Sequence, residues 1–211
     1  GAEPSINLEM ELQRARLANS DTLEFTLSGP LQLVGKGGTA TLGGDLRVDS
    51  ARIQLVQVET SEVPQLQVRR AGAVPMPQAQ PTLTASNLKL DVRVRADDRV
   101  RVEGMGLDSI WRGDVRIKGS ARQPQLVGVA TLVRGDFSFA GSDFDLSSGR
   151  VVFNGRPLDS SINIRAQTQA QDVTAVVEIA GTAGKPEIRF SSTPALPEDE
   201  ILARLLFGSS V

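Results

Sequence analysis

The chain has 211 residues, with 23 basic and 25 acidic side chains and a formal net charge of −2. This balance argues against nucleic acid as a partner, because nucleic-acid-binding surfaces are strongly basic. The sequence contains no Cys and no His, so the usual zinc, copper and thiolate sites and a Ser–His–Asp triad are excluded. We therefore expect a protein that is not an enzyme and that needs no metal or cofactor.

Apolar and polar residues alternate over most of the chain, beginning in the first dozen residues. This period of two is typical of β-strands with one apolar face and one charged face. Turn-forming sequences separate the alternating stretches, which favours antiparallel connections and about a dozen short strands. The clearest alternating stretches are residues 6–12, 23–27, 88–94 and 173–179.

The strand pattern also repeats along the chain. Gly29, Gly35 and Gly44 recur 84 positions later as glycines, and the apolar residues between them recur as apolar residues. Such a repeat is typical of stacked, self-similar strand sets. We expect a first strand set over residues 3–70 and a second over 82–208, which includes a C-terminal helix. Residues 71–81 contain three prolines and no charge, and we interpret them as a linker within one continuous sheet.

Few helices are expected, so the apolar face of the sheet must be covered in another way. The sheet either closes into a sandwich or barrel, or folds into a trough whose apolar interior stays partly open. An aliphatic interior suits acyl chains and an ordinary β core equally well, and the pattern alone leaves both open. The candidate inward residues are Leu46, Val48, Leu90, Val92, Val94, Val115, Ile117, Leu126, Leu132, Val151, Ile162, Ile164 and Val177.

The C-terminal residues predict one short helix. Pro197 and the three acidic residues after it suit a helix N-terminus, and Gly208 is a suitable stop. A helix of about three turns is unstable alone and must pack on another surface. It caps the trough, docks a partner, or packs on the last strands. Its candidate partner-binding residues are Ile201, Leu202, Leu205, Leu206 and Phe207.

The second half of the chain resembles the C-terminal domain of the TamB family. The resemblance covers roughly residues 110–208, and the stretch most like the family's hallmark is 194–208. The other matching segments are 135–139, 144–155, 162–166, 179–182 and 186–192.

This resemblance implies an all-β fold, in which a long, curved, antiparallel-rich sheet forms a trough with an apolar interior. It also implies a periplasmic protein of a diderm bacterium, anchored in the inner membrane by a segment outside this sequence. The implied partners are phospholipid acyl chains, the outer-membrane barrel protein TamA and outer-membrane protein clients. The implied roles are phospholipid transport and outer-membrane protein assembly.

An alternative function uses the edges of the sheet instead of its interior. An assembly factor could template barrel strands by pairing with an exposed edge strand, while the interior is only a closed core. Against this, charges on the strands could blunt the edges. The residues considered for that role are Arg93, Arg95, Asp114 and Lys118.

Overall fold

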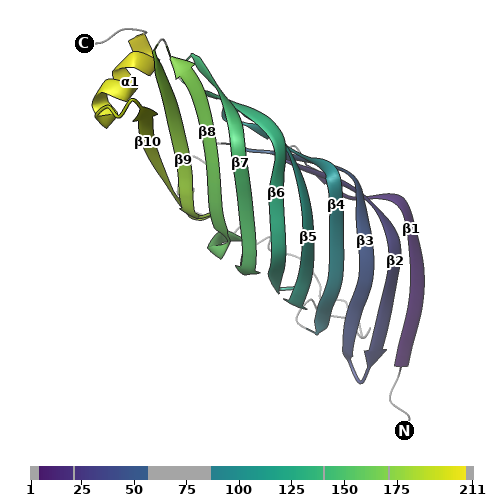
Figure 1. Ribbon diagram of the computed structural model, residues 1–211. Coiled ribbons are helices and arrows are strands. Elements are labelled where there is room, and N and C mark those ends of the chain that lie inside the picture. Colours follow the sequence, from purple (N-terminus) through teal and green to yellow (C-terminus); the bar gives the residue numbers. More distant parts are fainter. Residues whose placement is uncertain (1–4, 21, 57–86, 140, 171, 208–211) are drawn as a thin grey trace, which may run out of the picture.

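The computed structural model describes residues 5–20, 22–56, 87–139, 141–170 and 172–207. These residues form one ten-stranded sheet and one C-terminal α-helix, with the strands side by side in sequence order (Figure 1). The sheet does not close on itself, so β1 and β10 are its two edges. The predicted fold class is therefore confirmed: an open, strand-dominated sheet with one short helix.

The strands of the described residues number ten, and they are longer than the sequence pattern predicted. They contain between 9 and 17 residues each. Their bounds are β1 (Ser5–Ser20), β2 (Leu23–Lys36), β3 (Thr39–Gln54), β4 (Leu88–Gly104), β5 (Leu107–Ser120), β6 (Gln123–Phe139), β7 (Ser142–Gly155), β8 (Ser161–Ala170), β9 (Val173–Thr182) and β10 (Lys185–Thr193). A 3₁₀ turn η1 (Pro157–Asp159) precedes β8, and α1 (Glu198–Phe207) ends the described chain.

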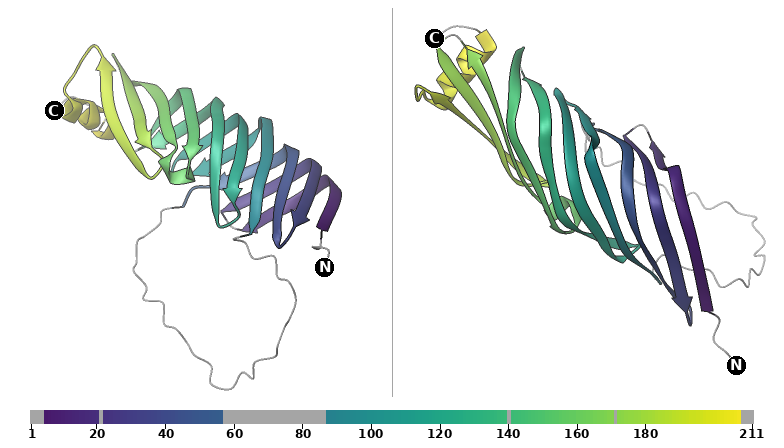
Figure 2. Two further views of the ribbon diagram at one scale, coloured as in Figure 1. Left: turned by 90° about the horizontal axis from the view of Figure 1, so that it is seen from below. Right: turned by 45° about the vertical axis from the view of Figure 1, so that its right-hand side comes forward.

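Bulges near the middle of several strands explain this length. The pairing register shifts between Leu12 and Ala15 in β1 and between Ala96 and Val100 in β4. A β-bulge bends a strand without ending it. Each bulged strand is therefore bent near its middle, and the sheet folds into a trough. Seen from below, the two halves of the bent strands lie as two layers that cross each other (Figure 2).

The repeat in the sequence is also a repeat of structure. Strand β2 begins at Leu23 and β5 begins at Leu107, and each strand is followed after two residues by the next one. The strands β1, β2 and β3 thus match β4, β5 and β6 at the spacing of 84. The bulges match too, because Arg14 and Asp98 both have a φ of 52°.

One pair of strands differs from the expected antiparallel pattern. Strands β3 and β4 pair in parallel, with Leu42 opposite Leu90 and Leu46 opposite Val94. All other pairs of neighbouring strands are antiparallel, so the sheet is mixed. The described strands on either side of this pair, β1–β3 and β4–β10, therefore lie in one continuous sheet, and the bounds of the two strand sets stay a prediction. The predicted linker, residues 71–81, lies outside the described residues.

Most of the buried apolar residues form two clusters on the concave face. One lies at the bend of the first strands and includes Leu27, Leu46 and Val92. The other lies under the C-terminal helix and includes Phe144 and Val177. The trough therefore has a packed floor at its first strands and a covered end at its last strands.

Candidate functional site

The strand register brings the predicted inward residues together on one face. Val92 lies opposite Ile117, which lies opposite Leu126 on the next strand. Val151 lies opposite Ile162, and the same alternation continues to β10. Because side chains opposite each other point to the same side of a sheet, these residues form an unbroken apolar face.

Burial divides the candidate residues into a floor and walls. Leu46, Val48 and Val92 are buried in the floor at the first strands, and Val177 is buried under α1. The other nine are half-buried; by the strand register, eight of them lie on one side of the bend, and Leu132 lies at the bend. These nine are Leu90, Val94, Val115, Ile117, Leu126, Leu132, Val151, Ile162 and Ile164. An apolar chain entering the trough would therefore contact the half-buried residues and not the floor.

At the C-terminal end, α1 covers the apolar face. Ile201 is 2% exposed and Leu205 is 5% exposed, and both pack in the cluster that contains Phe144. The Ser142 hydroxyl donates a hydrogen bond of 3.2 Å to the Leu205 carbonyl. Arg204 forms an ion pair of 3.0 Å with Asp172, in the turn that precedes β9. The helix is thus held by apolar packing and by polar contacts at the rim.

This packing bears on the predicted partner-binding residues. Ile201 and Leu205 are occupied inside the molecule, whereas Leu202 is half-buried. The side chains of Leu206 and Phe207 lie outside the described residues. A partner-binding role for the helix stays a prediction, and in this arrangement it falls to Leu202 and not to the two buried residues.

At the opposite end, the apolar face is open. Ile6, Leu8 and Met10 of β1 are 44%, 46% and 40% exposed. They lie opposite Gly35, Leu33 and Leu31 of β2 and so belong to the same face as the trough walls. The two ends of the trough therefore differ: the helix covers one, and no described residue covers the other.

The convex face carries Arg–carboxylate pairs between neighbouring strands. Arg93 pairs with Asp114 through bonds of 2.9 and 2.5 Å, and Arg116 pairs with Asp91 through bonds of 2.6 and 2.8 Å. These residues lie in β4 and β5, inside the sheet. The interpretation that Arg93, Arg95, Asp114 and Lys118 blunt exposed edges is therefore wrong, because their strands are paired on both sides.

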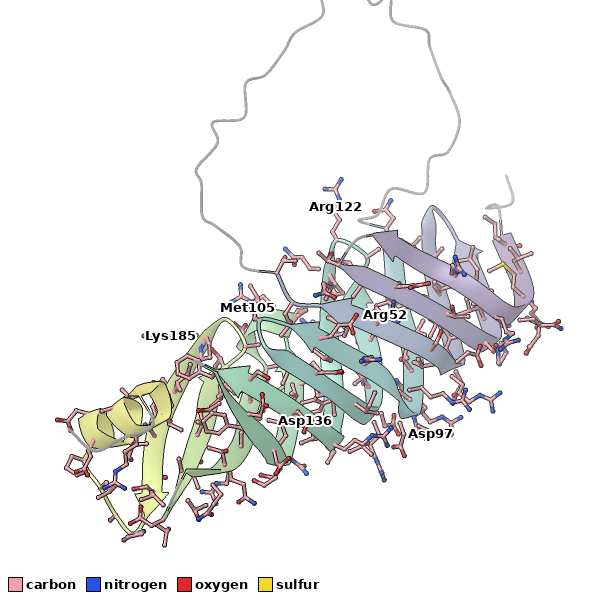
Figure 3. The ribbon with its side chains drawn as sticks, turned by 90° about the horizontal axis from the view of Figure 1, so that it is seen from above. Arg52, Asp97, Met105, Arg122, Asp136 and Lys185 are labelled. Carbon is pink, nitrogen blue, oxygen red and sulfur yellow. The ribbon has the colours of Figure 1, made fainter. Side chains whose placement is uncertain are left out.

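Charged residues also surround the bend and the turns. Asp97, in the bulge of β4, and Arg122, in the turn after β5, point away from the ribbon on opposite sides (Figure 3). A hollow of about 790 Å³ on the polar face is lined by residues that include Glu9, Asp91 and Arg116. Five of its eleven lining residues are charged, which disfavours acyl chains there, so the apolar trough remains the candidate site.

The ion pairs of the convex face predict a pH dependence of stability. Hydrogen bonds from Arg116 and Arg93 lower the pKa of Asp91 and of Asp114 below the ordinary value of 3.8. A lowered pKa stabilises the fold above the pKa of the unfolded chain, and this stability is lost as the pH falls through the folded pKa. We expect the melting temperature to fall more steeply below about pH 4 in the wild type than in an Arg93→Gln, Arg116→Gln variant. Equal slopes in thermal melts would contradict this.

Sequence reasoning missed the residues that anchor the covered end. Phe144 is 1% exposed, and its ring centroid lies 6.1 Å from that of Phe137. Trp111 lies outside that cluster but is also buried and was not predicted; its indole N–H donates a bond of 2.9 Å to the Ser109 hydroxyl. The signal was present, because residues 143–146 alternate charged and apolar side chains.

Two kinds of site are absent from the described part of the chain. No group of three or more acidic side chains in those residues could hold a metal ion. No helix there is long and apolar enough to cross a membrane.

The sequence was compared with models of known protein families, and the model for the TamB C-terminal domain matches residues 1–211. The chain belongs to the TamB family. One similar TamB protein is the translocation and assembly module subunit TamB of Haemophilus influenzae, which is 27% identical over 138 residues. That match covers 63% of this chain but only 11% of the relative. TamB membership is thus found for the whole chain, including the first strand set, which the motifs alone did not reach.

Proposed function

We propose that this chain is a periplasmic part of a TamB-like envelope protein, and that its trough shields phospholipid acyl chains for transport to the outer membrane and supports outer-membrane protein assembly. The observation that carries the proposal is the unbroken apolar face from β1 to β10, with half-buried aliphatic walls. An ordinary core would bury these side chains fully, since an exposed apolar surface of this extent is costly in water. Acyl chains are flexible and apolar, and they match aliphatic walls.

The proposal also includes partners and location. The relative's name makes it a subunit of a translocation and assembly module. We extend this to the present chain and propose a TamA-type outer-membrane barrel as its partner, with an inner-membrane anchor elsewhere in the full protein. The proposal assigns no catalysis, metal or cofactor to the chain.

Site-specific photo-cross-linking tests the acyl-chain proposal. A photoreactive residue at Val115 or Leu132 faces the trough, whereas one at Lys118 lies on the convex face of the same strand pair. In cells that express the full-length protein, we expect labelled phospholipid at the first two positions and little at Lys118. Absence of lipid at Val115 and Leu132 in a folded protein would contradict the proposal.

A charged wall provides a second test. Leu132 is half-buried opposite Trp111, so Leu132→Asp places a carboxylate on the apolar path. We expect this variant to lose most lipid capture, because a charge is strongly disfavoured beside acyl chains. The matched control Thr131→Asp changes the exposed neighbour on the opposite face and should retain capture. Circular dichroism would show that both variants fold.

The open edges favour a second candidate function. Strand β10 forms one edge of the sheet, and Ile188 on its apolar face is exposed. Such an edge could bind a client strand during barrel assembly. Native mass spectrometry of the purified chain distinguishes the two functions, because co-purified phospholipid is expected only for the acyl-chain trough.

A further inference from the structure

The two lips of the trough, where the strands begin and end, carry opposite charges. One lip contains the turns β2–β3, β5–β6, β7–β8 and β9–β10 and the start of β4, and it is the lower edge of the sheet in Figure 1. The other lip contains the end of β3 and the turns β1–β2, β4–β5, β6–β7 and β8–β9. In the described turns and the two terminal residues of each strand, the first lip has five basic side chains and one carboxylate, whereas the second has five carboxylates and no basic side chain. The basic lip carries Lys36, Lys89, Arg122, Arg156, Lys185 and Asp159, and the acidic lip carries Glu24, Glu103, Asp108, Asp143 and Asp172.

Most of the charge on the basic lip is not neutralised within the described protein. Arg156 donates a bond of 2.8 Å to Asp159, so this pair cancels. Lys89, Arg122 and Lys185 are exposed and form no ion pair with a described residue, and Arg122 points away from the ribbon (Figure 3). The arginines inside the sheet, such as Arg93 and Arg116, are by contrast bonded to aspartates of the neighbouring strand. The basic lip therefore offers its charge to an anion from outside the chain.

The basic lip also borders the apolar wall that is open to a ligand. Eight of the nine half-buried candidate residues lie on the arm of the sheet that ends at this lip. Lys89 is followed directly by one of them, Leu90. The Ala121 N–H donates a bond of 2.9 Å to the Leu88 carbonyl, which places the turn with Arg122 beside the start of β4. Because long basic side chains lay their stems on apolar surface and keep the charge in water, they suit the boundary between this wall and solvent.

We propose that the basic lip binds the phosphate of the phospholipid whose acyl chains lie along the adjoining wall. All lipids in the trough then have their headgroups at the same lip, because the acidic lip repels the phosphate. Lysine and arginine bind phosphate through charge-assisted hydrogen bonds. Consecutive turns of the lip lie about 10 Å apart, two strand spacings, so a phosphate that leaves one turn meets the next. This proposal rests on the proposed acyl-chain function.

Competition between two lipids with the same acyl chains tests the role of the phosphate. Dioleoyl phosphatidylglycerol and dioleoylglycerol are offered at equal concentration to the purified 211-residue chain, and native mass spectrometry counts the bound molecules. We expect the wild type to prefer the phospholipid by about three- to tenfold, as a few exposed charge contacts provide. A Lys89→Gln, Arg122→Gln variant should lose most of this preference and still bind dioleoylglycerol.

The matched control removes the same charge away from both lips. Arg134 and Arg150 are exposed and lie nearer the bend, so an Arg134→Gln, Arg150→Gln variant should keep the preference. An equal loss in the two variants would overturn the proposal, because net charge and not the lip would then select the phosphate. Equal binding of both lipids by the wild type would overturn the lip proposal and leave the acyl-chain trough standing. Binding of neither lipid would overturn both.

Photo-cross-linking in cells that express the full-length protein locates the headgroup. Gln123 begins β6 on the basic lip and Asp143 lies near the start of β7 on the acidic lip, and both are exposed. A photoreactive residue should label phospholipid at Gln123 and not at Asp143, and equal labelling at both would overturn the proposal. The Leu132→Asp substitution, which obstructs the trough, should abolish the labelling at Gln123. Labelling that persists in this variant would overturn the proposal as well, because the lip would then contact a bilayer surface and not a lipid held in the trough.

Discussion

Replacing Phe144 by alanine is expected to lower the free energy of unfolding by about 3–5 kcal/mol, as is usual when a fully buried aromatic side chain is removed. Phe144 is the largest fully buried side chain of the chain's described part. It joins strands β7 to β9 to the helix residues Ile201 and Leu205. Its removal leaves a cavity between the sheet and the helix, which neither can fill without moving.

Phe139→Ala is the matched control for this prediction. Phe139 lies near the end of β6 and stacks on Phe137 at 6.1 Å, but it is 39% exposed. We expect its loss to cost about 1 kcal/mol, because less apolar surface leaves contact with protein. Urea unfolding followed by circular dichroism measures both variants. Equal losses would mean that Phe144 is not the anchor of the covered end.

The alternation of apolar residues was sufficient to predict which face of each strand is apolar. This prediction depends only on the period of two. It holds from one strand to the next because the register places apolar residues opposite apolar residues. The number of strands was not predictable in this way. A bulge such as that at Ala96–Val100 interrupts the alternation, so one bent strand resembles two short ones in sequence.

The parallel pair β3–β4 was also not predicted, although its signal was present. Tight turns join antiparallel strands, whereas a parallel pair needs a connection of about a dozen residues or more. Gln54 and Leu88 are separated by a stretch of sufficient length. From its composition, part of this stretch was interpreted as a linker between strand sets. Composition alone does not show at which end of the sheet the next strand begins, and therefore whether that strand is parallel or antiparallel.

The position of α1 could not be derived from its own residues. An amphipathic stripe shows that Ile201 and Leu205 share a face, but it does not show which surface receives that face. The receiving surface consists of Phe144, Ala166 and Val177, which come from three different strands. Alanine gives almost no signal in a hydrophobic pattern, so this part of the site emerges only from the three-dimensional arrangement.

The repeated glycines now have a physical explanation, which leads to the last prediction. A Cβ on Gly44 would stand 2.5 Å from the Pro30 carbonyl oxygen of the neighbouring strand. A Cβ on Gly128 would overlap the matching carbonyl oxygen, that of Asp114, and would stand 2.8 Å from the Val115 Cα. The same close approach of two strands thus occurs in both copies of the repeat, at the same place.

Gly128→Ala is therefore expected to destabilise the protein by at least about 2 kcal/mol. Two costs add: the clash with backbone atoms that cannot move away, and the φ of +150°, which side chains other than glycine rarely adopt. Gly113→Ala is the control in the same strand pair, because its Cβ would stand 3.3 Å from the nearest atom and its φ is not in the positive range. It should change stability by less than about 1 kcal/mol.

Chemical denaturation of the two variants measures this difference, and its outcome bears on the origin of the repeat. If Gly128→Ala is strongly destabilising and Gly113→Ala is not, glycine is retained where strands approach most closely, and the spacing of 84 reflects a shared backbone geometry. Equal, small effects would mean that the strands separate easily at this point. The trough wall around Val115 would then be deformable, and its width would not be set by the glycine.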